Sequence, residues 1–319
     1  MYAIDATDVT KRYGDVTALD DLSLRVETGS TFGLLGTNGA GKTTLFKLLV
    51  GHVAPDAGSL EVAGRDVATE GPAVRRFVGY LPEQAGFPGS LTGREVLAFH
   101  ARMRGLPTAE RETRVAEVLE TVGLTDAADR AVDGYSNGMN RRLGLATALL
   151  PRPRVLLLDE PTAGLDPLGV SAFHRIVRRL REEADLTVVL SSHVLTEVEA
   201  LCDSVAVLHD GRLRAVGSVA ELKAATDGRP TVRVRLADGG DPGEVLAVAT
   251  RHGGSVASTE AAVEFVCERG RVPAALEALN GLEAVDGFEV TETGLDRVFE
   301  SALTDERDAD AAVPSEVKA

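Results

Sequence analysis

The sequence has no tryptophan, only two cysteines and only five lysines. The scarcity of cysteine argues against a disulfide-rich or zinc-binding protein. Cys202 and Cys267 lie far apart, with no CxxC or Cys/His spacing, so neither a zinc site nor a disulfide framework is predicted. Apolar runs such as Val155–Leu158 and Leu186–Leu190 are much shorter than the ~20 residues of a membrane span. The first nine residues carry acids and no apolar stretch, so they do not indicate a signal peptide. We therefore expect a soluble chain in a reducing cytoplasm.

The charge is one-sided, with 49 acidic residues against 34 basic ones and a formal net charge of −15. Such a surface argues against nucleic acid as a partner. All but five of the basic residues are arginine. An acid-rich, lysine-poor chain is similar to halophilic proteins, in which hydrated carboxylates keep the protein in solution. A genome rich in G and C would favour the same residues, and the composition leaves both explanations open.

Through residue ~225, short apolar strands alternate with helical patterns, which is typical of a sheet flanked by helices. The expected strands include Thr31–Leu35, Val155–Leu158, Leu186–Leu190 and a hairpin that turns at Asp210-Gly211. The expected helices are Lys42–Val50, one opened by a Thr92/Glu95 capping box, and one that ends at Gly123. The first domain is predicted to be α/β.

The pattern changes near Thr226–Pro230, where a second domain is predicted to begin. Its expected elements are strands at Thr231–Leu236, Ala262–Val266 and Phe288–Thr291, and helices at Pro242–His252, Pro273–Leu279 and Leu295–Leu303. They make a small α+β domain of residues 227–303. Residues 304–319 are polar and acidic without periodicity, and we expect a disordered tail there.

A glycine-rich loop follows the strand expected at Thr31–Leu35. It fits G-x-x-x-x-G-K-[ST] and consists of Gly36, Thr37, Asn38, Gly39, Ala40, Gly41, Lys42 and Thr43, with Thr44 next. Its glycines let backbone amides turn toward phosphates at a helix N-terminus. Lys42 is expected to bridge the β- and γ-phosphates, and the Thr43 hydroxyl to ligate Mg²⁺. The loop predicts nucleotide binding, but alone it does not separate a GTPase from a kinase or a motor.

Two carboxylates, Asp159 and Glu160, end the apolar strand Val155–Leu158. Open α/β sheets bind their ligands at the carboxyl ends of the strands. Asp159 therefore suits a direct or outer-sphere Mg²⁺ ligand, while Glu160 can polarise a water for attack on the γ-phosphate.

With these motifs in this order, residues 1 to about 225 resemble the ATP-binding cassette (ABC) family. The further matching residues are Tyr13 for the aromatic that stacks on adenine, Gln84 for the glutamine that senses Mg²⁺ and the attacking water, Ser136-Asn137-Gly138-Met139 for the signature motif, Asp166 for the D-loop, and His193 for the switch histidine. The resemblance implies a P-loop NTPase cassette at residues 1–226, with a RecA-like core, an antiparallel β subdomain and a helical subdomain at about residues 85–150.

The signature motif implies a partner. Ser136 and the amides around Gly138 lie where a helix is expected to begin, which makes a second anion site. In the family this site closes on ATP held by the opposite protomer, so a homodimer, or a heterodimer with a similar cassette, is expected around two ATP molecules. Tyr135, Asn137 and Met139 depart from the common Leu-Ser-Gly-Gly-Gln form, which puts side-chain contacts of the missing glutamine in doubt.

The resemblance implies an ATPase subunit that drives a separate multispanning permease from the inner face of the cell membrane. Phe87–Glu95 lies where the family docks a permease segment. Two alternatives are a soluble ABC ATPase acting in translation or DNA repair, and a scaffold that binds nucleotide without hydrolysing it. The single cassette and acidic surface disfavour the first, and the presence of Glu160 and His193 disfavours the second.

The C-terminal part narrows the subfamily. Gly294–Ala302 resembles the end of exporter cassettes of the daunorubicin-resistance type. Ser192–Ala200, Ala215–Ser218 and Gly79–Leu106 also resemble the cassette of the copper-site maturation system of nitrous oxide reductase. Both subfamilies stay open, and no residue of this chain is expected to touch the cargo.

Overall fold

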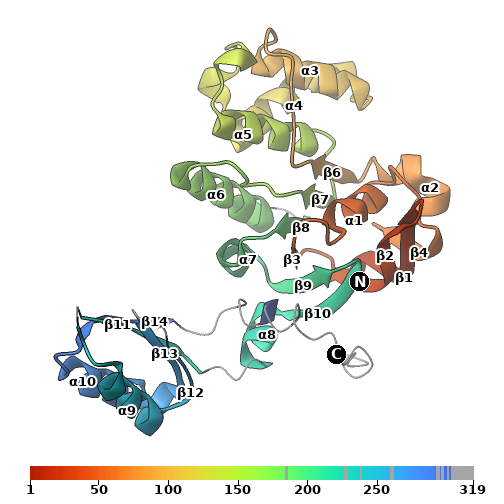
Figure 1. Ribbon diagram of the computed structural model, residues 1–319. Coiled ribbons are helices and arrows are strands. Elements are labelled where there is room, and N and C mark those ends of the chain that lie inside the picture. The colour runs from red at the N-terminus through yellow and green to blue at the C-terminus, as the bar shows by residue number, and fades with distance from the viewer. Residues whose placement is uncertain are drawn as a thin grey trace. The chain divides into compact units, whose positions relative to one another are not determined.

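The computed structural model describes residues 1–183, 186–225, 229–237, 239–258, 262–291, 295, 298–299 and 302. The chain forms two compact units, Met1–Ser218 and Val219–Thr304. Figure 1 shows the first in red to green and the second in teal to blue. None of the described helices combines the length and the apolar character of a membrane span.

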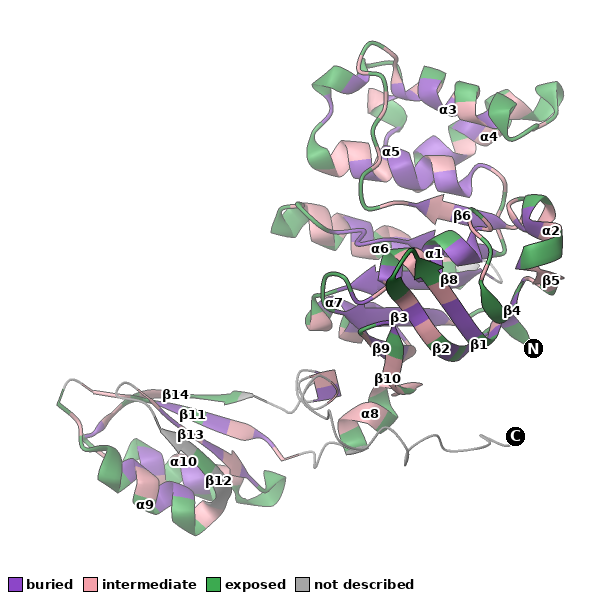
Figure 2. Ribbon diagram, turned by 45° about the vertical axis from the view of Figure 1, so that its right-hand side comes forward, coloured by how far each residue is buried: buried purple, intermediate pink, exposed green. Residues whose placement is uncertain are grey.

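The first unit is built on a six-stranded sheet with the order β10-β9-β3-β8-β7-β6. Its strands are β3 (Thr31–Gly36), β6 (Val78–Leu81), β7 (Val155–Leu158), β8 (Thr187–Ser192), β9 (Ser204–His209) and β10 (Arg212–Ser218). All neighbours are parallel except β9 and β10. Every residue of β3, β7 and β8 is buried, which explains their continuous apolar runs, because helices cover both faces of a parallel sheet. Figure 2 shows this buried centre in purple.

Helix α1 (Lys42–Leu49) lies on one side of this sheet, and α6 (Pro167–Glu183) and α7 (Leu195–Leu201) lie on the other (Figure 1). The predicted hairpin is confirmed, since β9 and β10 join through Asp210 and Gly211, which have φ of 47° and 75°. Two consecutive positive φ values are those of a type I′ turn.

A second, antiparallel sheet has the order β2-β1-β4-β5. It consists of β1 (Tyr2–Tyr13), β2 (Val16–Glu27), β4 (Ala57–Val62) and β5 (Arg65–Asp66), followed by α2 (Val67–Val74). Leu22, Leu24 and Val26 alternate inward along β2. They share one apolar core with Phe46 of α1 and Leu157 of β7, so the two sheets sandwich α1 and support the loop that precedes it.

Three helices form a separate subdomain, α3 (Gly93–Met103), α4 (Thr108–Thr121) and α5 (Asn137–Leu149). The predicted capping box is present, with the Thr92 side chain accepting from the Glu95 amide and the Glu95 side chain accepting from the Thr92 amide. Gly123, with a φ of 65°, follows the end of α4 as predicted. The predicted fold class is therefore confirmed, with a RecA-like core, an antiparallel β subdomain and a helical subdomain.

The second unit contains α8 (Val219–Ala225) and a four-stranded antiparallel sheet with the order β12-β13-β11-β14. Its strands are β11 (Thr231–Leu236), β12 (Gly253–Ser258), β13 (Ala262–Cys267) and β14 (Val285–Thr291), with helices α9 (Pro242–His252) and α10 (Val272–Asn280). The sequence did not predict β12, because Gly253-Gly254 follows α9 directly and only Val256 carries a strand-forming side chain. The helix expected at Leu295–Leu303 lies largely outside the described residues, and the tail expected at 304–319 lies entirely outside them.

Candidate nucleotide-binding site

The glycine-rich loop connects the carboxyl end of β3 to the first turn of α1. Gly41, at the N-cap of α1, has a φ of 109°, and a Cβ there would come within 2.6 Å of the Ala18 carbonyl oxygen. Gly39 has a φ of 86° and faces open space. Only glycine accepts both the backbone angle and the close approach at residue 41, so the loop is held in a phosphate-cradling shape.

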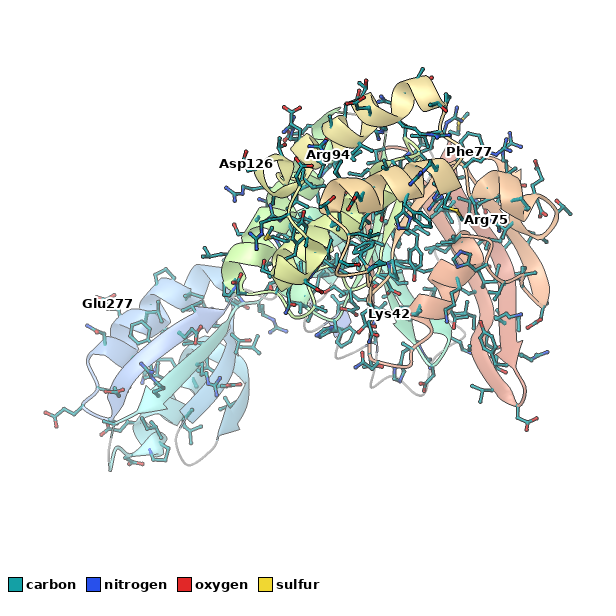
Figure 3. The ribbon with its side chains drawn as sticks, turned by 90° about the horizontal axis from the view of Figure 1, so that it is seen from above. Lys42, Arg75, Phe77, Arg94, Asp126 and Glu277 are labelled. Atoms are coloured by element: carbon teal, nitrogen blue, oxygen red, sulfur yellow. The ribbon has the colours of Figure 1, made fainter. Side chains whose placement is uncertain are left out.

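A pocket of about 640 Å³ opens over this loop. Its lining consists of Val16, Thr17, Ala18, every residue from Thr37 to Thr44, Glu83, Glu160, Asp210 and Gly211. The structure therefore brings the predicted loop residues and Glu160 together around one cavity. Figure 3 labels Lys42 at the start of α1.

Lys42, Glu160 and His193 form the charged centre of the site. The Lys42 ammonium donates to the Gly36 carbonyl at 2.6 Å and lies 3.2 Å from Oε1 of Glu160. His193 Nδ1 lies 2.8 Å from Oε2 of the same carboxylate. Lys42 and Glu160 are buried, whereas the His193 side chain is 58% exposed. Lys42, predicted from the phosphate loop, and His193, predicted from the family resemblance, therefore contact the two oxygens of the Glu160 carboxylate.

Asp159 is held beneath this centre rather than in the pocket. Its side chain is buried, with Oδ1 accepting from Ser191 Oγ at 2.7 Å and Oδ2 from the Tyr80 hydroxyl at 3.3 Å. Burial, together with the Asp159 carboxylate, raises the pKa of Tyr80, so the hydroxyl stays protonated and able to donate. The arrangement fixes the Asp159 carboxylate behind the pocket wall.

Glu160 has an unusual backbone, with a φ of 43°. A non-glycine residue in this region is strained, and such strain persists only where neighbouring groups hold it. Its amide donates to Ser191 Oγ at 2.9 Å, and its carbonyl accepts from Arg141 Nη2 at 2.8 Å.

Tyr13 and Gln84 lie outside the pocket lining, as do Gly36, Asp159 and His193. Tyr13 is 45% exposed and pairs across the β1–β2 hairpin with Val16, which does line the pocket. The Lys11 ammonium lies 5.6 Å from the centre of its ring. Gln84 is exposed, and its neighbour Glu83 is the residue that reaches the pocket lining.

The signature motif forms a second pocket, of about 500 Å³. Ser136 caps α5 by accepting from the Met139 amide at 3.2 Å, and Asp166 Oδ1 accepts from the Gly169 amide at 2.6 Å near the start of α6. The residues that line it include Ser136, Asn137, Gly138, Gly164, Leu165, Asp166 and Leu168. The phosphate-loop pocket and the signature pocket share no lining residue, so one chain carries two separate sites.

Sequence reasoning missed three residues that support the site: Arg141, Ser191 and Glu197. The Glu197 carboxylate, in α7, accepts from Thr162 Oγ1 at 2.6 Å and from Ser192 Oγ at 3.2 Å. The sequence pattern could have indicated Arg141, because it shares a helix face with the apolar residues Leu145 and Leu149. A charged residue on such a face is expected to be buried and to have hydrogen-bond partners. Ser191 follows an apolar strand, where a polar side chain reaches the carboxyl edge of the sheet.

The residues present fit a nucleoside triphosphate with its metal. Oε1 of Glu160 is buried and accepts no hydrogen bond, although the Lys42 ammonium lies nearby, so one oxygen is left for a ligand that enters the pocket. Thr43 is exposed and lines the pocket at the start of α1. The described residues contain no cluster of three His, Cys, Asp or Glu side chains suited to a metal. Mg²⁺ needs no such cluster, because substrate phosphates and water supply most of its ligands.

Known proteins similar to this chain also bind ATP. The family described as "ABC transporter" matches residues 19–163. The chain is 40% identical over 311 residues to a daunorubicin resistance ATP-binding protein of Streptomyces coeruleorubidus, covering 96% of this chain and 97% of that protein. It is also 40% identical over 210 residues to a bacitracin transport ATP-binding protein of Bacillus licheniformis, covering 66% of this chain and 68% of the relative.

Among solved structures, cbiO1 of Clostridium perfringens, described as part of an ABC transporter complex, superposes with a TM-score of 0.64 at 30% identity. The superposition covers 70% of this chain and 91% of that one. The full-length similarity to the daunorubicin resistance protein, together with the phosphate-loop site, shows that this chain belongs to the ABC transporter family and is an ATP-binding, ATP-hydrolysing subunit of the exporter type.

Proposed function

We propose that two copies of this chain close around two Mg-ATP molecules, and that this closure drives a separate multispanning permease from the cytoplasmic face of the cell membrane. The observation that carries the proposal is the separation of the two pockets. A phosphate loop and a signature motif that do not share a cavity within one chain need a second copy to complete each site. Leu168, which lines the signature pocket, is 81% exposed and offers apolar surface for that copy.

Within each site we assign roles by position. Lys42 and the loop amides bind the phosphates, and Thr43 ligates Mg²⁺, with Asp159 behind the pocket wall as an outer-sphere partner. Glu160 orients and polarises the attacking water, and His193 steadies that carboxylate. Tyr13 stacks on adenine, and Gln84 reaches Mg²⁺ and the water from its exposed position when the dimer closes. When bound, Mg²⁺ neutralises charge that develops on the phosphates.

The Lys42–Glu160 contact suggests how ATP readies the site. The ammonium contacts both the Gly36 carbonyl and the Glu160 carboxylate. A γ-phosphate carries more negative charge than one carboxylate and would draw Lys42 away from Glu160. Glu160 would then be free to accept a hydrogen bond from water, so that base activation follows substrate binding.

Ser136→Arg should abolish ATP-dependent dimerisation and leave ATP binding to the monomer intact. The bulky cation would fill the signature pocket, whereas the phosphate loop lies in a different cavity. Light scattering after gel filtration, with and without Mg-ATP, measures the mass. Thr108→Arg is a matched control, because it adds the same charge at an exposed position of the helical subdomain. A Ser136→Arg chain that still dimerises with ATP would show that the signature site does not act in the partner.

We propose that the permease docks along the helical subdomain. In the predicted docking segment Phe87–Glu95, the Phe87 ring meets His100 of α3 edge-on at 6.0 Å. Beyond the far end of α3 lies a cleft of about 1050 Å³. Basic residues outnumber acidic ones in its lining, which includes His52, Arg75, Arg76, Arg104, Arg114 and Arg152 beside Glu110 and Glu117. Burial lowers the pKa of His52, and the positive charges of Arg75 and Arg104 lower it further. In a chain of net charge −15, this cleft suits an acidic segment of the permease.

Arg76→Glu should reduce the permease recovered with the chain from detergent-solubilised native membranes by about tenfold, which corresponds to ~1.4 kcal/mol. Arg76 is exposed and lines the cleft, so charge reversal there acts on the partner more than on folding. Arg102→Glu, at an exposed position of α3 outside the lining, is the control. Recovery of equal amounts of permease by both variants would contradict docking at this cleft.

The relatives support export as the transport direction. Their names refer to daunorubicin resistance, bacitracin transport and Nod factor export. We therefore favour an exporter of the drug or lipid kind over the copper-site maturation system. ATPase activity in native membranes that rises with an exported drug and ignores copper salts would test this choice.

A further inference from the structure

Arg141 belongs to helix α5 of the helical subdomain, and its guanidinium group is buried. It lies against the turn Asp159–Pro161, which carries Glu160 and is called the catalytic turn below. It donates from Nε to the Pro161 carbonyl at 2.7 Å, and from Nη2 to the carbonyls of Asp159 at 2.5 Å and Glu160 at 2.8 Å. From Nη1 it donates to the carbonyls of Pro82 at 2.6 Å and Glu83 at 2.7 Å. All five acceptors are backbone oxygens, so the guanidinium group holds backbone segments in place and does not pair with a carboxylate.

These acceptors belong to two segments that matter for hydrolysis. Asp159 to Pro161 form the turn that carries Glu160, and Pro82-Glu83 lead directly into Gln84. Arg141 itself lies five residues after Ser136, in the second turn of α5, the helix that Ser136 caps. One side chain therefore joins the signature helix to the catalytic turn and to the glutamine segment.

The contact between Arg141 and the Glu160 carbonyl supports an unfavourable backbone angle. Glu160 holds a left-handed backbone angle of 43°, which is unfavourable for a side chain of this kind. Ser191 fixes its amide from one side, and Arg141 fixes its carbonyl from the other. If the Arg141 contact is removed, we expect the peptide after Glu160 to relax and the carboxylate to move with it.

We propose that Arg141 is the positioning residue through which the signature helix controls Glu160: when Ser136 engages the partner's ATP, any shift of α5 is passed by the guanidinium to the catalytic turn. This inference rests on the proposed dimer. It makes turnover at one ATP depend on the state of the other, without a contact between Arg141 and either nucleotide.

Arg114 is the matched comparison for a purely structural arginine. It is also partly buried, and it donates to the carbonyls of Leu149 and Leu150, which ties α4 to the end of α5. It touches neither the catalytic turn nor the glutamine segment in the described contacts. Desolvation by burial lowers the pKa of both arginines, that of Arg141 to about 10. Burial thus desolvates both guanidinium groups, and the two side chains differ in which backbone segments they hold.

Arg141→Gln and Arg141→Lys should each lower kcat about 100-fold while KM for ATP stays within about threefold, because a small misplacement of a catalytic group has this effect on rate. Lysine keeps the charge but lacks the planar fork that reaches both segments. Arg114→Gln should lower the melting temperature without this loss of kcat. If the melting temperature of Arg141→Gln falls more than about ten degrees below that of the wild type, the kcat of Arg141→Lys is used for the test instead.

Nucleotide-driven dimerisation separates this inference from the function on which it rests. In a chain that also carries Glu160→Gln, Arg141→Lys should still dimerise with Mg-ATP. A normal kcat in a folded Arg141→Lys chain would overturn the role of Arg141 and leave the dimer standing. Failure of Glu160→Gln alone to dimerise would overturn the dimer itself.

Discussion

Replacing Glu160 with glutamine should lower steady-state ATP turnover by about a thousandfold, within the range that a positioned general base supplies. The amide keeps the size of the side chain but cannot accept a proton from water. It also removes the ion pair with Lys42, so the lysine becomes free for phosphate. ATP should therefore bind at least as tightly as to the wild type, and a long-lived closed dimer should accumulate.

The measurements are phosphate release at saturating Mg-ATP and equilibrium binding of a fluorescent ATP analogue. Glu120→Gln, the same change at an exposed position of α4, serves as the control. Turnover of Glu160→Gln near that of the wild type would exclude Glu160 as the principal base. Lost ATP binding would instead mean that the carboxylate supports the phosphate loop, and that the proposed order of events is wrong.

Replacing Lys42 with alanine should weaken ATP binding by about 30- to 100-fold, because the phosphates lose a charge-assisted contact of ~2–3 kcal/mol. The ammonium is buried and already held by loop carbonyls, so its position needs little rearrangement when phosphate arrives. Turnover should fall further than affinity, since charge on the transferring phosphoryl group is then less well stabilised.

Lys47→Ala is the matched control for Lys42→Ala, because it removes an exposed lysine from the same helix. Equilibrium titration with and without Mg²⁺ gives the affinity of each variant. If Lys42→Ala binds ATP as tightly as Lys47→Ala does, the phosphates do not lie where the loop geometry places them.

The sequence predicted those parts of the fold that follow from local rules. An apolar run predicted β7 at its observed bounds, and the Thr92/Glu95 pair predicted the start of α3. By contrast β12 escaped prediction, because its pairing with β13 compensates for a weak local preference. The resemblance to ABC proteins supplied the antiparallel sheet, which strand patterns alone had not indicated.

For the site, motifs predicted which side chains carry the chemistry but not what holds them. Motifs predicted Lys42 and Glu160, and the family resemblance predicted His193. The structure shows Lys42 and His193 in contact with the two oxygens of the Glu160 carboxylate. The strained angle of Glu160 and its support by Ser191 and Arg141 depend on contacts between distant segments, which no local pattern reports. The saline origin suggested by the acidic composition stays a prediction.

The most direct test of the account is a cross-link between two copies. Asn38, in the phosphate loop, and Asn137, in the signature motif, are both exposed, and the native Cys202 and Cys267 are buried, so single cysteines introduced at the two asparagines can be read cleanly. Chains carrying Asn38→Cys and chains carrying Asn137→Cys, each also with Glu160→Gln, are mixed and oxidised. We expect a disulfide between the two different chains that requires Mg-ATP and that neither chain gives alone. ATP-loaded chains that form no such mixed disulfide would contradict completion of each site by the partner.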